Sequence, residues 1–279
     1  MAAPWSFDGR VAVVSGASGG MGEAIARRLA ADGARLVLMA ADGDAQALEA
    51  IGDDLQADGH EVRLALGDIA DPATSRAAVH AAMEGFGRLD YVVNNAGIYP
   101  ERPLLDETAE FYDRIFAINV LGLQSLCRAA VPLMTAPGGA ITCTASTCSL
   151  RAIERYAAYN MSKGAVLQFA RELAVQLAPR GIRVNIVAPG VISAPATDEW
   201  TRDASVWSKQ RSRIPMDRIG RPTEVAAVTS FLLSDRASYV AGATVMVDGG
   251  ESSGWRDSDW SVVPQGDPAP RLRSVGGVA

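Results

Sequence analysis

Short, continuously apolar runs alternate with longer helical stretches along almost the whole chain, and this alternation limits the possible folds more than any other feature. The runs that predict strands are 10–15, 35–40, 62–66, 89–94, 140–144, 183–187 and 244–247. The stretches that predict helices are 22–32, 42–58, 71–86, 106–134, 156–178 and 222–233. Continuously apolar strands belong to parallel sheets that are covered by helices on both faces. We therefore expect one α/β domain with a doubly wound parallel sheet of about seven strands.

Composition excludes several other classes of protein. The 279 residues suffice for one large α/β domain, and the formal net charge of -6 argues against a nucleic-acid or anionic-membrane partner. No apolar run approaches the ~20 residues that span a bilayer, and the N-terminus lacks the features of a signal peptide. The three cysteines and two histidines have no metal-ligand spacing. We expect a cytoplasmic, reduced protein without a metal site.

A glycine-rich loop follows the first predicted strand and precedes the first predicted helix. It reads Ser15-Gly16-Ala17-Ser18-Gly19-Gly20-Met21-Gly22. Glycines let a backbone turn tightly and approach a pyrophosphate, while a helix N-terminus offers free N–H groups and the positive end of its dipole. This placement predicts a dinucleotide site; a tight turn without a ligand is the less favoured alternative.

Tyr159 and Lys163 lie four residues apart in a predicted helix, so they share one face about one turn apart. Lys163 and Lys209 are the only lysines, whereas the chain uses Arg elsewhere. A lysine kept at this position suggests a role for a compact ammonium with rotatable donors, which a guanidinium cannot fill. The alternative is a solvent-exposed lysine that happens to follow a tyrosine.

Taken together, these motifs resemble those of the short-chain dehydrogenase/reductase family, from about Phe7 to Gly250. The matching segments are the glycine loop with Ser15 in place of Thr, Asn94-Asn95-Ala96-Gly97, Asn119 within a helix, Ser146 thirteen residues before the tyrosine, Tyr159 with Lys163, and Pro189-Gly190. Asp68-Ile69 resembles the family's adenine-contacting pair. The resemblance implies a Rossmann fold and NAD(P)-dependent oxidoreductase activity.

The resemblance also implies four catalytic residues, each with its own chemistry. Tyr159 would act as general acid/base, and the ammonium of Lys163 would bind ribose hydroxyls and lower the tyrosine pKa from its ordinary value of about 10. Ser146 would donate to the substrate oxygen, with Thr147 and Ser149 as less favoured rivals. Asn119 would hold a water that links Lys163 to solvent, unless it is an ordinary amide in a helix interior.

The implied cofactor contacts are Gly16, Ser18, Gly20, Met21, Gly22, Asp42, Asp68, Ile69, Asn95, Ala96, Gly97, Tyr159, Lys163, Pro189, Gly190 and Ile192. NAD-preferring members of the family close the second strand with an acid, where this chain has Ala40. NADP-preferring members often have Arg at the next position, where this chain has Ala41. No cation is evident for a 2′-phosphate, and Asp42 would repel one, so we expect NAD.

In the resembling family the substrate lies between the fourth and fifth strands and the loop after the sixth. The expected contacts are Ser146, Ile153, Tyr159 and Val191. The remaining wall candidates are mostly apolar or aromatic: Ile98, Tyr99, Leu150, Tyr156, Ile192, Trp200 and Trp207. We therefore expect a hydrophobic secondary alcohol or ketone. Arg102, Arg151 and Arg155 leave open an acidic or carrier-linked substrate, as in the similar ketoacyl-carrier reductases.

The resemblance gives expectations for domains and assembly. We expect a dinucleotide-binding and catalytic domain over 1–250, with a substrate loop at 190–218, and a homotetramer built on the two long helices and the last strand. The Gly-, Ser- and Pro-rich extension over 251–279 is either disordered or docks on a neighbouring subunit through its tryptophans. A non-catalytic dinucleotide-sensing protein is the alternative of a different class. It would be expected to have lost a catalytic residue, and none is lost.

Overall fold

The computed structural model describes residues 6–193, 208 and 211–254. Trp200, Trp207 and the tryptophans of the C-terminal extension lie outside the described residues. The strands are β1 (Val11–Ser15), β2 (Arg35–Ala40), β3 (Val62–Leu66), β4 (Tyr91–Asn94), β5 (Ala140–Thr144), β6 (Arg183–Pro189) and β7 (Thr244–Val247). The α-helices are α1 (Gly20–Ala31), α2 (Ala45–Ala57), α3 (Pro72–Phe86), α4 (Ala109–Phe116), α5 (Gly122–Ala130), α6 (Ala157–Leu177) and α9 (Pro222–Leu233).

All seven strands form one parallel sheet in the order β3-β2-β1-β4-β5-β6-β7. Val13 of β1 is in register with Val37 on one side and with Val92 on the other. The chain winds outward from this central strand in both directions, so the strand order reverses between β1 and β4. A ligand crevice forms at such a reversal, beyond the carboxyl ends of the strands. The predicted doubly wound fold is confirmed.

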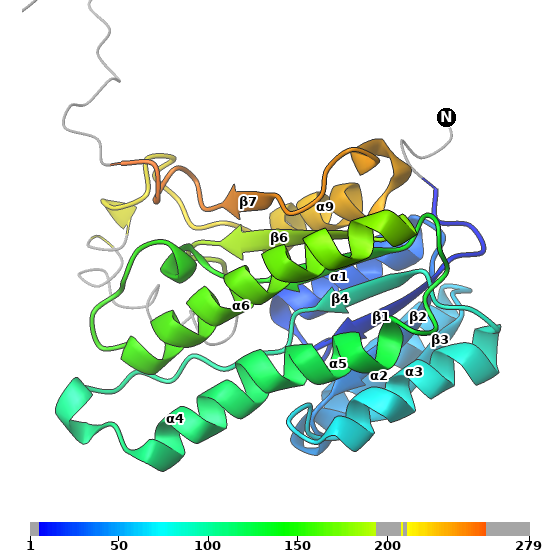
Figure 1. The fold of residues 1–279 in the computed structure, drawn as a ribbon, viewed down its shortest axis with the longest axis horizontal. Coiled ribbons are helices and arrows are strands. Elements are labelled where there is room, and N and C mark those ends of the chain that lie inside the picture. The colour runs from blue at the N-terminus through cyan, green and yellow to red at the C-terminus, as the bar shows by residue number, and fades with distance from the viewer. Residues whose placement is uncertain (1–5, 194–207, 209–210, 255–279) are drawn as a thin grey trace, which may run out of the picture.

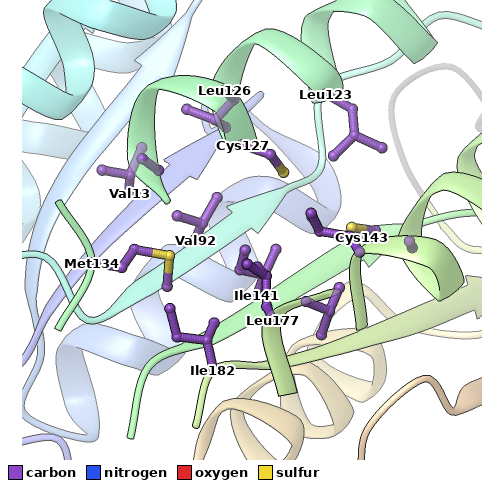
Figure 2. Packing of buried hydrophobic residues seen from close by; sticks show 14 of the residues in the cluster. Val13, Val92, Leu123, Leu126, Cys127, Met134, Ile141, Cys143, Leu177 and Ile182 are labelled. Carbon is purple, nitrogen blue, oxygen red and sulfur yellow. The ribbon is translucent and has the colours of Figure 1, made fainter. Parts of the chain in front are cut away.

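Two apolar layers form because successive side chains of each strand point to opposite faces of the sheet. Val11 and Val13 belong to a buried cluster with α3, α5 and α6, whereas Ala12 and Val14 belong to a second cluster with α1, α2 and α9. Figure 1 shows the sheet between these two sets of helices. Figure 2 shows the first cluster, in which Val13, Val92 and Ile141 of three neighbouring strands meet Leu123 and Leu126 of α5.

The helical segment predicted over 106–134 is one uninterrupted helical stretch from Ala109 to Ala130, shorter than predicted at both ends and with a π-helical part inside it. It begins at Ala109, where the Thr108 side chain caps it by accepting a hydrogen bond from Phe111 N at 3.3 Å. A π-helical stretch, Ala117–Leu121, separates α4 from α5. Such bulges admit an extra residue into a turn and are frequent at functional sites. Here the bulge contains Asn119, whose side chain is buried.

The carboxyl ends of the strands meet at one edge of the sheet. The arrowheads of β6 and β7 point to this edge, and segment 211–218 lies beyond them (Figure 1). The glycine loop leaves β1 here, and the segments that carry Gly97, Ser146 and Gly190 leave β4, β5 and β6. Within the part of the chain that the structure describes, no helix is long and apolar enough to cross a membrane.

Candidate active site

The glycine loop is so tightly packed that two of its positions exclude any side chain. Gly16 has a φ of +66°, and a Cβ there would lie 2.8 Å from Ala96 Cα. A Cβ on Gly22 would lie 1.9 Å from the Gly16 carbonyl oxygen. In front of α1 the space is open instead, since a Cβ on Gly19 would meet no atom within 4 Å. The free N–H groups of the first helical turn therefore face a space that can take an anion.

Ser15 joins the turn after β1 to the turn after β4. Its hydroxyl oxygen accepts from Asn95 N at 3.1 Å and from Ala96 N at 3.2 Å. The Asn95 side chain donates back to the Gly16 carbonyl at 3.1 Å. Ser15, which replaces the family's Thr, thus supplies the acceptor that fixes Asn95 and Ala96 against the glycine loop.

An acidic side chain does reach the glycine loop, but it is Asp44 rather than Asp42. The Ser18 hydroxyl donates to Asp44 Oδ2 at 3.2 Å, whereas Asp42 is exposed at the start of a short 3₁₀ helix, Asp42–Asp44. Sequence reasoning missed Asp44, although the Asp-Gly-Asp triplet after β2 could have drawn attention to it. Both carboxylates lie just beyond the end of β2, so this corner of the site is acidic.

The other predicted cofactor residues border the same edge. Asp68 accepts from Ala70 N at 2.9 Å and pairs with Arg114 at 2.6 Å, while Ile69 is buried against Gly122 of α5. Gly190 N donates to Val247 O at 3.0 Å, which carries the β6–β7 pairing into the Pro-Gly turn. Ile192 is buried in a cluster against which Met21 of α1 packs. These residues fit a dinucleotide that runs from the β2 corner to the Pro-Gly turn.

Lys163 is buried, with only 4% of its surface exposed. Its ammonium donates to the Thr144 carbonyl at 2.9 Å and lies 3.3 Å from the position that a Cβ on Gly97 would take. Burial disfavours the charged form and lowers the pKa of Lys163 to about 8. A buried amine with one protein acceptor has donors left for hydroxyl groups of a ligand beside Gly97.

Ser146 precedes a 3₁₀ turn, Thr147–Ser149, and its hydroxyl faces Tyr159. Ser146 Oγ accepts a hydrogen bond from Cys148 N at 3.1 Å, so the backbone amide occupies an acceptor position and leaves the hydroxyl proton to be donated. The hydrogen bond between Ser146 and Tyr159 favours the tyrosinate and opposes the rise in the Tyr159 pKa. Ser149 has a different task, because its hydroxyl donates to the Lys163 carbonyl at 2.9 Å. The geometry therefore favours Ser146 over Ser149.

Burial raises the pKa of Tyr159, and the nearby Cys148, Tyr99 and Tyr156 raise it further. The overall shift of the Tyr159 pKa is upward, and Lys163 is not among its causes, so the expected lowering by Lys163 stays a prediction. The Lys163 ammonium is directed to Thr144 and lies 5.7 Å from the centre of the tyrosine ring, and its own charge is disfavoured by burial. The tyrosine is accordingly a proton donor at neutral pH.

Asn119 contacts backbone rather than another catalytic side chain. Its Oδ1 accepts from Ile98 N at 2.8 Å, and its Nδ2 donates to Ile98 O at 2.9 Å and to Ser162 Oγ at 3.0 Å. Ser162 in turn donates to Tyr159 O at 2.8 Å. The expected role of Asn119 as the holder of a water stays a prediction, since its amide is engaged with Ile98 and Ser162.

Two aromatic rings lie beside the ring of Tyr159. Tyr99 and Tyr156 lie 6.1 and 6.3 Å from Tyr159 between ring centres. Ile153 stands on the adjoining loop, and the Asn160 side chain holds it by accepting from Ile153 N at 3.4 Å and donating to Ile153 O at 2.9 Å. Asn160, a residue that sequence reasoning missed, thus acts on Ile153 as Asn119 acts on Ile98.

The comparisons with known proteins agree with this geometry. Residues 16–252 match the family model described as enoyl-(acyl carrier protein) reductase. A 2-(R)-hydroxypropyl-CoM dehydrogenase from Xanthobacter autotrophicus is 42% identical over 246 residues, which cover 86% of this chain and 97% of that protein. The chain belongs to the short-chain dehydrogenase/reductase family.

Solved structures of short-chain dehydrogenases/reductases share the fold. One from Brucella melitensis, described as a glucose/ribitol dehydrogenase, has a TM-score of 0.83 at 34% identity and covers 88% of this chain and 98% of its own. A short-chain dehydrogenase from Burkholderia cenocepacia, solved with NADP, has a TM-score of 0.83 at 34% identity, with coverages of 89% and 99%. The chain is therefore an oxidoreductase of this family, and a nicotinamide dinucleotide fits the residues at its sheet edge.

Each of the three arginines that left open the possibility of an acidic substrate has a partner within the protein. Arg155 pairs with Glu101, Arg151 pairs with Glu251, and the Arg102 guanidinium lies 4.3 Å from the centre of the Phe111 ring. Glu251 is a further residue that sequence reasoning missed, because it falls in the segment taken for the extension. The carbonyl of Val191, just after β6, accepts from Gly220 N at 2.9 Å.

Proposed function

We propose that the protein interconverts a hydrophobic secondary alcohol and its ketone with NAD, and that Tyr159 is the general acid/base. The observation that carries this proposal is the contact between the Ser146 and Tyr159 hydroxyls, one turn of α6 from the buried Lys163. Two hydroxyl donors that converge on one point can bind and protonate a single substrate oxygen.

The roles of the side chains follow from their protonation. Ser146 donates its proton in a hydrogen bond to the substrate oxygen, since its own oxygen accepts from Cys148 N. Tyr159, whose pKa is raised, gives its proton to this oxygen when a ketone is reduced. In the reverse direction the tyrosinate takes the hydroxyl proton of the alcohol. A bound nicotinamide dinucleotide supplies or accepts the hydride of the carbinol carbon. Lys163 would bind the ribose of this dinucleotide through the ammonium N–H groups that do not donate to Thr144 O.

The walls of the site support a neutral, apolar substrate. The rings of Tyr99 and Tyr156 lie beside the Tyr159 ring, and Asn160 of α6 holds the backbone of Ile153; apolar and aromatic walls are typical of sites for small apolar ligands. The pairing of Arg155 with Glu101 and of Arg151 with Glu251 leaves these cations already neutralised. An anionic substrate would have to displace a carboxylate from one of them.

A second candidate is an acidic or carrier-linked substrate. The family model's description names an acyl-carrier reductase, and the relative from Xanthobacter autotrophicus is named for a CoM-linked hydroxypropyl group. Matched ketones with and without a carboxylate, assayed on the wild type and on Arg155→Ala, separate the two candidates. Equal kcat/KM for both ketones supports the neutral substrate, whereas a preference for the acid that Arg155→Ala abolishes supports the second candidate.

The preference for NAD rests on the acidic corner at the end of β2. Asp44 touches the glycine loop through Ser18, and Asp42 stands two residues away. Carboxylates at this corner would repel a 2′-phosphate. The related structure from Burkholderia cenocepacia holds NADP, so the preference has to be measured on this chain. A larger kcat/KM with NAD than with NADP supports the proposal, and the reverse order contradicts it.

We further propose a homotetramer in the cytoplasm. Leu121, Met161 and Val175 are 57%, 56% and 79% exposed on the helices that were expected to pair between subunits. Exposed apolar side chains on such helices favour association. Cys127, Cys143 and Cys148 are buried free thiols, as suits a reducing compartment. A monomer mass in light scattering would contradict the tetramer.

An assay of turnover separates an enzyme from a dinucleotide sensor of the same fold. Purified protein is given NAD or NADP with a panel of secondary alcohols, and NADH or NADPH with the matching ketones. The proposed function predicts turnover of at least the apolar members of the panel. Tight binding of the reduced cofactor without turnover of any member would support the sensor instead.

A further inference from the structure

Arg151 and Glu251 join two segments that are far apart in sequence. Arg151 Nη2 pairs with the Glu251 carboxylate, and Nη1 donates to the Glu251 carbonyl at 3.2 Å. The Glu251 side chain is only 4% exposed, so the carboxylate is buried within its own subunit. Buried charges require a partner, because the loss of hydration is costly. The pair therefore ties the segment after β7 to the segment after β5.

The segment after β5 is the turn that presents Ser146. Leu150 N and Arg151 N both donate to Thr147 O at 3.1 Å, so Arg151 completes the same turn. The turn has a second anchor in the hydrogen bond from the Ser149 hydroxyl to Lys163 O. Ser146 is thus held from one side by α6 and from the other side by Glu251, through Arg151.

Glu251 also lies against the Pro-Gly turn after β6. A Cβ on Gly190 would lie 2.8 Å from Glu251 Oε2 and 2.7 Å from Asp248 Cβ. Asp248 shapes the turn that presents Glu251, since its carboxylate accepts from Gly250 N at 3.0 Å and from Ser252 N at 2.8 Å. Glu251 therefore fills the space between the Ser146 turn and Gly190.

We infer that Glu251 is a positioning residue of the active site, which holds the Ser146 turn through Arg151 and supports the Gly190 turn by direct contact. The Ser146 turn faces the substrate and the Gly190 turn faces the expected nicotinamide. Glu251 therefore fixes the position of the substrate relative to the nicotinamide. This inference rests on the proposed dehydrogenase activity. It places the start of the segment 251–279 within the catalytic unit of its own subunit.

The kinetic test compares Glu251→Gln and Arg151→Met with the wild type. Displacement of reacting groups by a fraction of an ångström to an ångström lowers kcat by about 10- to 100-fold, and we expect a loss in this range for both variants. The primary deuterium isotope effect on kcat should rise, because hydride transfer becomes slower than the other steps. A smaller folded fraction would lower the rate without changing the isotope effect. Asp54→Asn is the matched control, since it removes the carboxylate of the exposed Arg27–Asp54 pair, and it should keep the wild-type kcat.

A measurement independent of turnover decides the inference if the wild type proves inactive on every alcohol. Hydrogen exchange of the Cys148 amide, which donates to Ser146 Oγ, should be faster in Glu251→Gln, while amides of α3 exchange as in the wild type. Turnover of the wild type tests the proposed function, and exchange at Cys148 tests the positioning role. Wild-type exchange at Cys148 in Glu251→Gln would overturn the inference, whatever the rate of the enzyme.

Discussion

The side-chain amide of Asn119 binds both backbone groups of Ile98, with Oδ1 accepting from its N–H at 2.8 Å and Nδ2 donating to its carbonyl at 2.9 Å. This pairing fixes the wall of the site that follows β4 to the π-helical turn between α4 and α5. A third contact, from Nδ2 to Ser162 Oγ, connects the same amide to α6 one residue before Lys163. Asn119 thus sets the distance between the substrate wall and the catalytic helix.

Replacement of Asn119 by Ala should affect stability and activity together. The variant leaves the half-buried N–H and carbonyl of Ile98 without their side-chain partner, and the loss of a hydrogen bond costs about 0.5–1.5 kcal/mol. We expect a lower free energy of unfolding in urea by roughly this amount, and a lower kcat because the Ile98 wall moves.

Asn160→Ala removes the equivalent pair of hydrogen bonds to the backbone of Ile153. It should raise the KM for the alcohol and leave kcat largely unchanged; equal behaviour of the two variants would contradict these separate roles.

Lys163→Arg keeps the positive charge and should still lose most of the activity. The ammonium is buried and donates to Thr144 O at 2.9 Å, and a planar guanidinium needs more room than this site offers. Preorganised donors of this kind contribute about 10²–10³ in kcat, so a loss of this order is expected. Steady-state kinetics with NAD and a secondary alcohol measure it. A kcat near that of the wild type would show that charge alone suffices at position 163.

The depressed pKa of Lys163 predicts a stability change at alkaline pH. The pKa falls from the ordinary lysine value of 10.5 to about 8 in the folded protein, so the unfolded chain binds more protons between these values. Above about pH 10.5 Lys163 is neutral in both the folded and the unfolded protein, so burying it costs no charge. As the pH falls through about 8, the folded protein must bury the charged ammonium, and this stability is lost. Relative to Lys163→Met, the wild type should gain on the order of 3 kcal/mol as the pH rises across this window. Urea unfolding of both proteins at the two ends measures it. A difference between them that does not change with pH would exclude a buried, destabilised ammonium.

Asp44→Asn should weaken the discrimination against NADP. Like charges a few ångströms apart in water repel by about 1 kcal/mol, which corresponds to a roughly fivefold change in the ratio of kcat/KM for NAD over NADP. The Ser18 hydroxyl can still donate to the new side-chain carbonyl, so the glycine loop should keep its shape. Asp54→Asn on α2 serves as the control and should leave the ratio unchanged. If Asp44→Asn leaves this ratio unchanged, residues other than Asp44 determine the cofactor preference.

Much of the fold could be predicted because the strands are continuously apolar and bounded by polar or glycine residues. The predicted strands 35–40, 62–66, 140–144 and 244–247 coincide with β2, β3, β5 and β7. The cap of α3 also follows local rules, since the Asp71 side chain accepts from Ala73 N at 2.8 Å and Pro72 stands at the first helical position. Each of these features depends on neighbours in sequence.

The features that could not be predicted depend on partners far along the chain. The π turn at Asn119 leaves no mark in the apolar periodicity, and it serves a backbone segment about twenty residues earlier. Glu251 lies in a polar, Ser-rich stretch that is typical of a tail, and only Arg151 and Gly190 explain its burial. The raised pKa of Tyr159 arises first from burial and then from the nearby Cys148, Tyr99 and Tyr156, which come from other parts of the chain or another turn.

The central claim is that Tyr159 exchanges a proton with a secondary alcohol whose carbinol hydride passes to NAD. The most direct measurement uses an alcohol that is deuterated at the carbinol carbon and follows deuterium into the reduced cofactor by mass spectrometry. The wild type should form NADH that carries deuterium, and Tyr159→Phe should form it about 10²–10⁴ times more slowly while still binding the cofactor. Deuterated NADH formed at the wild-type rate by Tyr159→Phe would contradict the account.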